Sequence, residues 1–253
     1  MLPGGMTPVV QLVAIIRNAS PRDAAQLLKD MPVDRLPVVT AAMGPGEVAR
    51  LLWAAPVDFR GALIDALTTE QLLEVLRAQQ TNQAVTLLSM LPDERLGVVA
   101  ESLSDKVVAA LLTRLPDSRQ AAVLEAMDPA KGFAALSRRY EQEVADSLVR
   151  ANVEVTFPNG APNGIVLVQG LGWRIVVAAR YGDDGTIALR DAEDGAYRLE
   201  ANGALSVTNL RPADAVVGHC RELRIQGQAV DAMRWTDTQH DGVLKRILVS
   251  LFQ

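Results

Sequence analysis

The sequence predicts a two-domain, mixed protein: an all-α solenoid over residues 1–130, followed by an α/β domain over residues 131–253. Two observations lead to this fold class. A helical pattern centred on a proline recurs four times in the first half. Near residue 130 the composition changes to short strand-like apolar runs separated by glycine-containing turns. With 253 residues, the chain is long enough for two modest domains.

The first half opens with "MLPGGMTPVVQLVAIIRNAS", which lacks a cationic start and a clear cleavage site, so we interpret it as a first helix. Four segments then share an Ala- and Leu-rich helix, a proline, an Asp and a second short helix. An extra helix, "TEQLLEVLRAQQ", lies between the second and third segments. We expect about five to seven helical elements, stacked because one helical hairpin cannot bury both of its faces. The prolines are Pro32, Pro56, Pro92 and Pro116, and the acids are Asp34, Asp58, Asp93 and Asp117.

The proline and the Asp of each segment have a physical reason. Proline lacks an N–H, so it ends one helix and suits the start of the next. The Asp then falls in a first helical turn, where a carboxylate favours the positive end of the helix dipole. We therefore interpret these acids as capping residues.

The repeated segments resemble a known family. "LLKDMPVDRLPVVTAAM" and "LLSMLPDERLGVVAESL" resemble the cytosolic N-terminal superhelical domain of MgtE-type magnesium transporters, over roughly residues 8–130. Helical modules of the flagellar motor switch protein FliG are similar. The resemblance implies a bacterial helical-repeat domain. In those transporters, acids of this domain help to sense magnesium together with a CBS domain, which this sequence does not resemble anywhere, so the magnesium site is not carried over.

The second half predicts a series of helices and strands. "GFAALSRRYEQEVADSLVRA" predicts a helix, and "VEVTF", "IVLVQ" and "WRIVVAAR" predict strands. "TIALRDA" and "YRLEA" predict an inserted hairpin, and "NG" at 202–203 is a further hairpin signal before the strand "ALSVTNL". "PADAVVGHCRELRI", with Pro212 in its first turn, predicts a helix, "AVDAMRW" a strand and "GVLKRILVSLFQ" a helix.

This α-β-β-β-α-β order resembles the PD-(D/E)xK, or restriction-endonuclease-like, fold. The sequence from "RRYEQEVADSLVRA" onward resembles Mrr-type nuclease domains. Those domains carry a helix Glu, an Asp at the second strand and Glu-x-Lys on the third. Alanine offers a metal no ligand, and arginine stays protonated, so the resemblance implies a degenerate site in a pseudoenzyme, with no catalytic, cofactor or metal residue. The corresponding positions are Glu141 or Glu143, then Asn163-Gly164, then Ala178-Ala179-Arg180.

Three other groups of chemically capable residues have structural interpretations. His219 and Cys220 are adjacent on a predicted helix, where neighbours point about 100° apart, so we expect a small buried thiol rather than a catalytic pair. "WTDTQHD" holds Asp237, His240 and Asp241, which we interpret as a loop in which Asp241 is the N-cap of the last helix. The acids of "YGDDG" and of "RDAEDG", which ends at Gly195, precede a glycine and indicate tight turns.

Composition limits the function. A net charge of −5 argues against a general affinity for nucleic acid, which needs a basic face. A single cysteine excludes an internal disulfide framework and favours a reducing compartment. No apolar run is long enough to span a membrane, so we expect a cytoplasmic protein.

These observations favour a non-catalytic scaffold or adaptor, with no cofactor, whose concave solenoid surface holds another protein. The second domain would be a further docking or dimerisation module, and a homo-oligomer stays open. Two alternatives remain. One is a metal-dependent nuclease with a migrated site, using carboxylates such as Glu141, Asp183 and Asp184. The other is a regulatory module that senses a divalent cation.

Overall fold

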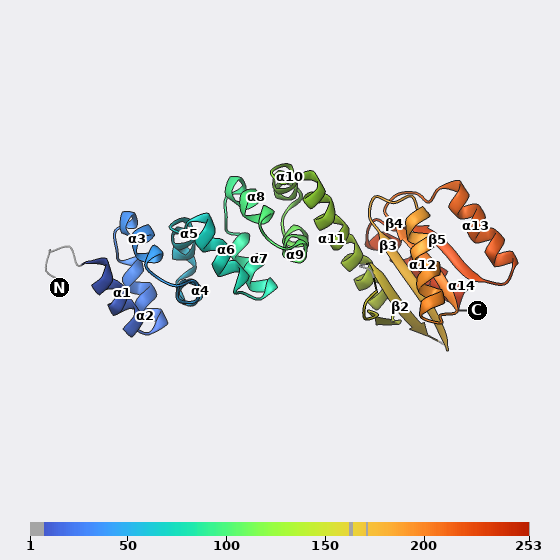
Figure 1. The fold of residues 1–253 in the computed structure, drawn as a ribbon, viewed down its shortest axis with the longest axis horizontal. Helices are drawn as coiled ribbons and strands as arrows, with labels where there is room; N and C mark the ends of the chain where they lie inside the picture. The colour runs from blue at the N-terminus through green and yellow to red at the C-terminus, as the bar shows by residue number, and fades with distance from the viewer. Residues whose placement is uncertain (1–7, 162–163, 171, 253) are drawn as a thin grey trace. The chain divides into compact units, whose positions relative to one another are not determined.

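The computed structural model describes residues 8–161, 164–170 and 172–252 (Figure 1). The chain divides into two compact units, Met1–Gly132 and Phe133–Gln253, which we call the helical unit and the α/β unit. Among the described residues, no helix combines the length and the apolar character that crossing a bilayer requires.

The helical unit has more and shorter helices than the sequence predicted. Each proline-centred segment supplies two separate helices, and α1 and α6 stand outside the four segments, so the expectation of five to seven elements was too low. In the described part of this unit, the elements before α11 are α1 (Val9–Asn18), α2 (Pro21–Lys29), the 3-10 helix η1 (Val33–Arg35), α3 (Leu36–Ala41), α4 (Pro45–Ala54), α5 (Val57–Asp65), α6 (Thr69–Arg77), α7 (Thr81–Leu88), α8 (Asp93–Glu101), α9 (Asp105–Arg114) and α10 (Asp117–Glu125).

The four prolines each occupy the N-cap position of the element that follows them, where a missing N–H leaves no helical hydrogen bond unmade. The acid that follows each proline lies in the first turn, as the sequence predicted. The capped elements are η1 after Pro32, α5 after Pro56, α8 after Pro92 and α10 after Pro116.

Equivalent positions of the four segments are buried alike, which confirms the repeat. The leucine four residues before each proline is fully buried, and so is the aliphatic residue seven positions after it. These two positions supply the core between the two helices of a segment and their neighbours. The leucines are Leu28, Leu52, Leu88 and Leu112, and the second set is Val39, Leu63, Val99 and Val123.

Within the helical unit, the helices form two rows. The first row packs in the succession α1, α2, α4, α6, α7 and α9. The helices that follow the prolines, α3, α5, α8 and α10, lie along one long side of the unit (Figure 1). Side chains join this second row: Arg95 Nη1 donates to the Ile64 carbonyl at 3.1 Å. Thr40 Oγ1, whose shortest acceptor is the Leu36 carbonyl at 2.9 Å, lies 3.4 Å from the Ala66 carbonyl oxygen. Arg119 Nε then donates to Asp93 Oδ1 at 2.6 Å, joining α10 to α8.

The α/β unit holds one five-stranded mixed sheet in the order β1-β2-β3-β4-β5. The pairs β1-β2 and β2-β3 are antiparallel, whereas β3-β4 and β4-β5 are parallel. Its elements are α11 (Pro129–Arg150), which begins in the helical unit and enters this one at Phe133, then β1 (Glu154–Thr156), β2 (Ile165–Gly170), β3 (Trp173–Arg180), α12 (Thr186–Arg198), β4 (Gly203–Thr208), α13 (Asp214–Ile225), β5 (Ala229–Arg234), the 3-10 helix η2 (Thr238–His240) and α14 (Asp241–Leu251).

Helices cover both faces of this sheet, so its central strands are apolar on both sides. One face packs against α11 and α14 through residues such as Val144 and Leu248. The other packs against α12 and α13 through residues such as Leu189 and Val216. Along β3 the side chains alternate between the two cores, so Ala178 faces α12 while Ala179 faces α11.

The predicted hairpin of "TIALRDA" and "YRLEA" is wrong, because the first segment and the start of the second lie in the single helix α12, which ends at Arg198. Its buried residues Ala188, Ala192 and Gly195 recur at helical spacing. Gly195, interpreted as a turn residue, instead permits close packing: a Cβ there would lie 2.9 Å from Val176 Cγ1 of β3. The glycine marks a helix–sheet contact and not a chain reversal.

The hairpin signal at 202–203 is also wrong, because β4 runs parallel to β3. Asn202 Oδ1 accepts from the Arg174 N–H at 2.8 Å and sets the start of this parallel pair. Gly203 lies where a Cβ would be 2.3 Å from the Ala229 carbonyl oxygen, so it allows β5 to approach. Pro212 precedes the N-cap residue of α13, Ala213, instead of lying in its first turn.

Candidate functional site

The candidate site lies where β3 ends, at Arg180. Its guanidinium is about one-fifth exposed and lies between two acids from different helices. Nε and Nη2 donate to Asp191 Oδ2 on α12 at 3.0 and 2.7 Å. Nη1 lies 3.8 Å from Glu141 Oε1 on α11. We call Glu141, Arg180 and Asp191 the Arg180 cluster.

Small residues allow the three elements of the cluster to meet. Ala178 is fully buried and Ala179 nearly so, which lets α12 and α11 approach opposite faces of β3. Gly164, at φ +77°, directly precedes β2 and lies against the same place. A Cβ there would lie 2.5 Å from the Ala179 carbonyl oxygen and 2.6 Å from Arg180 Nη1. Only glycine fits this backbone geometry and this space.

The structure therefore brings together most of the positions that the nuclease resemblance singled out. Glu141, Gly164, Ala178 and Arg180 are adjacent, whereas Asn163 lies outside the described residues. Glu143 is not part of the cluster, because it accepts from Arg139 Nε at 2.7 Å one turn along α11.

Asp191, which accepts from Arg180 Nε and Nη2, was missed from the sequence. The stretch around it was interpreted as a strand, which gave Asp191 no reason to lie near the end of β3. A helical interpretation would have found it, because α12 begins soon after β3 ends and returns across the sheet.

Within the Arg180 cluster, the positive charges of arginines oppose the effect of burial on Glu141. Burial raises the pKa of Glu141, while the charges of Arg180 and Arg138 lower it and oppose that rise. Arg138 Nη1 adds a hydrogen bond to Glu141 Oε2 at 3.4 Å. The two acids are thus neutralised by guanidinium groups, and a metal ion would have to displace Arg180 to use both of them.

Two acids of the alternative nuclease site, Asp183 and Asp184, accept hydrogen bonds from backbone N–H groups. Asp183 accepts from the N–H groups of Gly185 and Ala188 at 3.2 and 2.8 Å, and Asp184 accepts from the Thr186 N–H at 3.1 Å. Hydrogen bonds with Thr186 lower the pKa of Asp184. These acids hold the turn before α12. In the described part of the chain, no group of three or more His, Cys, Asp or Glu side chains is arranged to hold a metal ion.

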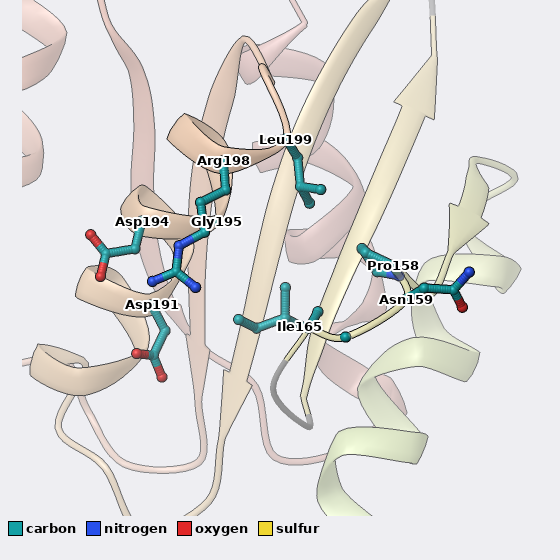
Figure 2. Close-up of a pocket in the computed structure, with 10 residues that line it drawn as sticks. Pro158, Asn159, Ile165, Asp191, Asp194, Gly195, Arg198 and Leu199 are labelled. Carbon is teal, nitrogen blue, oxygen red and sulfur yellow. The ribbon is translucent and has the colours of Figure 1, made fainter.

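Two small cavities border the cluster. One, of about 210 Å³, lies between α12 and the loop after β1; its charged side is Asp191, Asp194 and Arg198 of α12, and Ile165 of β2 lies on its apolar side (Figure 2). The other, of about 190 Å³, is lined by Arg138 and Glu141, among others. Both are smaller than the roughly 300–1,000 Å³ usual for ligand pockets, so neither fits a nucleotide or a larger cofactor.

The remaining candidates have structural roles. Cys220 is 1% exposed on the inner face of α13, and burial raises the pKa of its thiol to about 11. His219 Nε2 lies 3.2 Å from Glu193 Oε1 and so pairs with α12 instead. His240 Nδ1 lies 3.7 Å from Asp237 Oδ1, and Asp237 caps the short helix η2.

Asp241 is not the N-cap residue that the sequence predicted, because it is the first residue of α14 and His240 precedes it as the cap. Its carboxylate instead joins three elements. Oδ1 accepts from Ser147 Oγ at 2.5 Å and from Trp235 Nε1 at 3.0 Å, and Oδ2 accepts from Arg150 Nε at 2.8 Å. These hydrogen bonds and the Arg150 charge lower the pKa of Asp241 against the opposing effect of burial.

Comparison with known proteins identifies the class of the helical region. Residues 43–137 match the sequence model of the MgtE intracellular N domain. The matched part, well under half of the chain, runs from Met43 to the first turns of α11 and includes three of the four proline-centred segments. A search of curated proteins finds no match to this chain. The expected resemblance to the MgtE N-terminal domain is therefore confirmed over residues 43–130 of the predicted 8–130.

Proposed function

We propose that this chain is a non-catalytic interaction protein. The helical unit presents a surface to another protein, and the α/β unit is a nuclease-like shell that acts as a second docking or dimerisation module. The observation that carries the non-catalytic part is the Arg180 cluster. Its guanidinium takes up the carboxylates that metal-assisted hydrolysis would need free.

Two features support the nuclease-like ancestry. The succession α11, β1, β2, β3, α12 and β4 reproduces the α-β-β-β-α-β order of the restriction-endonuclease-like fold. Glu141 and Arg180 meet at the end of β3, where the helix acid and the Glu-x-Lys lysine of that fold would meet. A fold supports a shared architecture and not an activity, so the site chemistry decides the function.

The interaction role rests on the helical unit. Repeats that bury one face against their neighbours leave a long continuous surface for a partner. The match to the MgtE intracellular N domain places this region among helical domains of that class.

A regulatory module that senses a divalent cation is the second candidate, and the same match favours it. The acids best placed for it are the first-turn acids, but two of them are already paired. Asp58 Oδ2 lies 2.7 Å from Lys29 Nζ, and Asp93 Oδ1 lies 2.6 Å from Arg119 Nε. A cation would have to compete with both pairs.

One preparation of the full chain tests these functions. Affinity capture with the intact chain should recover a defined partner in near-stoichiometric amount, or a second copy of the chain as judged by light scattering. Incubation with DNA and Mg²⁺ or Mn²⁺ should leave the DNA intact. Metal-dependent cleavage would contradict the proposal and favour the nuclease that uses Glu141, Asp183 and Asp184. A rise in melting temperature with millimolar Mg²⁺, and no partner, would favour the cation sensor.

A further inference from the structure

The row formed by η1, α3, α5, α8 and α10 carries exposed aliphatic side chains at related repeat positions. Val33 and Val57, each directly after its proline, are 70% and 71% exposed. Val38 and Val98, each six residues after its proline, are 54% and 56% exposed. The next residue in each case, Val39 or Val99, is fully buried, so the exposed valines lie on the outward side of helices that are otherwise packed.

The same row is acidic. Counted over η1, α3, α5, α8 and α10, eight Asp and Glu residues stand against four arginines. Over α1, α2, α4, α6, α7 and α9, five acids stand against seven Lys and Arg residues. The negative charge of the helical unit is therefore concentrated on one of its two rows.

Three of the four arginines in the acidic row are turned toward the protein. Arg60 donates to the carbonyls of Ala55 and Trp53 at 3.0 and 3.2 Å. Arg95 donates to the Ile64 and Leu67 carbonyls at the end of α5. Arg119 donates to the Ser89 and Leu91 carbonyls at 2.9 and 2.6 Å. The side chains of Arg95 and Arg119 are only 21% and 26% exposed, so they face helix ends more than solvent.

Several acids remain exposed at the start or end of these helices. Glu94 and Asp117 lie in first turns, and Glu125 ends α10. Within the part of the chain that the structure describes, Glu94 and Glu125 have no ion pair, and Asp117 accepts only a long hydrogen bond from Gln120, at 3.4 Å. Exposed carboxylates and exposed valines thus occur on the same row, and Glu94 and Val98, four residues apart on α8, share one side of that helix.

We propose that this surface, defined by Val33, Val38, Val57 and Val98 with Asp34, Glu94, Asp117 and Glu125, docks a cationic amphipathic segment of a partner protein. Aliphatic side chains of the segment would cover the valines, and its Lys or Arg side chains would face the acids. This inference rests on the proposed interaction function and adds the location of the surface and the chemistry of the partner.

The test uses the full chain and a synthetic 18-residue peptide with Leu and Lys at helical spacing as the probe. Binding is measured by fluorescence anisotropy at two salt concentrations. A peptide of the same composition with scrambled order keeps the charge and removes the apolar face. The helical-spacing peptide should bind about tenfold more tightly than the scrambled one, because only it can bury the valines.

Paired variants locate the surface. Val57→Ser with Val98→Ser should weaken binding about tenfold, and Glu94→Lys with Glu125→Lys should weaken binding and flatten its salt dependence. Val10→Ser, at an 80% exposed position on α1 in the other row, and Glu70→Lys on α6 are the matched controls and should change affinity less than about twofold. All changed side chains are exposed, and circular dichroism checks that each variant folds.

The outcomes separate the two proposals. Equal binding of both peptides, or equal loss in the α1 and α6 controls, would overturn the docking surface. If the Val57→Ser, Val98→Ser chain still recovers the partner found by affinity capture, the surface is wrong while the interaction function stands. If the intact chain recovers no partner, the interaction function itself fails.

Discussion

The helical unit and the α/β unit use arginine in opposite ways. In the helical unit, Arg95 and Arg119 donate mainly to backbone carbonyls at the ends of neighbouring helices. In the α/β unit, Arg180 is held by the carboxylates of Asp191 and Glu141. Loss of Arg95 or Arg119 would leave neutral carbonyl oxygens without a donor, whereas loss of Arg180 would leave negative charge in a largely buried place. The same residue type therefore supports repeat stacking in one unit and neutralises largely buried carboxylates in the other.

Arg180→Met should have the largest effect. It leaves Asp191 and Glu141 without their shared cation in a largely buried place and should lower the free energy of unfolding by about 3 kcal/mol at neutral pH. Hydrogen exchange measured on peptides should assign the loss to α11, β3 and α12. Unchanged exchange there would show that the cluster contributes no stability.

The pH dependence of the same variant sharpens the comparison. Burial raises the pKa of Glu141 and Arg180 opposes this rise, so Arg180→Met should raise that pKa further. A carboxyl whose pKa is higher in the folded than in the unfolded state favours folding when it is protonated. The deficit should therefore shrink as the pH falls from about 7 to about 5. A deficit that grows on acidification would contradict this assignment.

Arg119→Met should have a smaller effect that depends little on pH over the same range. It removes the donor to the Ser89 and Leu91 carbonyls and to Asp93, and should cost about 2 kcal/mol of unfolding free energy. Denaturant unfolding followed by circular dichroism measures it. Arg114→Met on α9, whose guanidinium contacts the exposed Asn82 side chain, is the control and should have a much smaller effect.

Gly97→Ala tests how closely neighbouring segments pack. A Cβ at Gly97 would lie 2.3 Å from the Ala126 Cβ, so the substitution should destabilise the helical unit by about 1.5 kcal/mol. Gly61, also five residues after its proline, has open space around it. Gly61→Ala should therefore stabilise the unit by about 0.5 kcal/mol. The same sign for both variants would mean that Ala126 moves aside without strain.

Lys29→Met should have the smallest effect. Its ion pair with Asp58 lies at the surface, where solvent screens the charges. The melting temperature should stay within measurement error, while the pKa of Asp58, which Lys29 lowers, should return toward its ordinary value, as NMR titration can detect. A clear drop in melting temperature would show that surface pairs between segments matter more than the carbonyl contacts of Arg119.

Local chemistry made the helical unit predictable and part of the α/β unit unpredictable. Proline, first-turn acids and buried leucines such as Leu52 and Leu88 act within a few residues, so the repeats could be recognised. The roles of Gly195 and Gly203 depend on Val176 and Ala229, which lie distant in the sequence. From the sequence alone, Gly195 and Gly203 therefore resembled turn residues, and α12 and the parallel pairing of β4 were not predicted. Because α12 was not predicted, the hydrogen bonds of Asp191 with Arg180 were not foreseen either.

The position of Cys220 provides a way to watch the sheet from one side. It is the chain's one cysteine, it faces the core beneath α13, and burial keeps its thiol protonated. A thiol reagent can therefore react only during the moments when α13 lifts away. The rate of thiol labelling at neutral pH would therefore report how often α13 opens, because no second thiol contributes to the labelling.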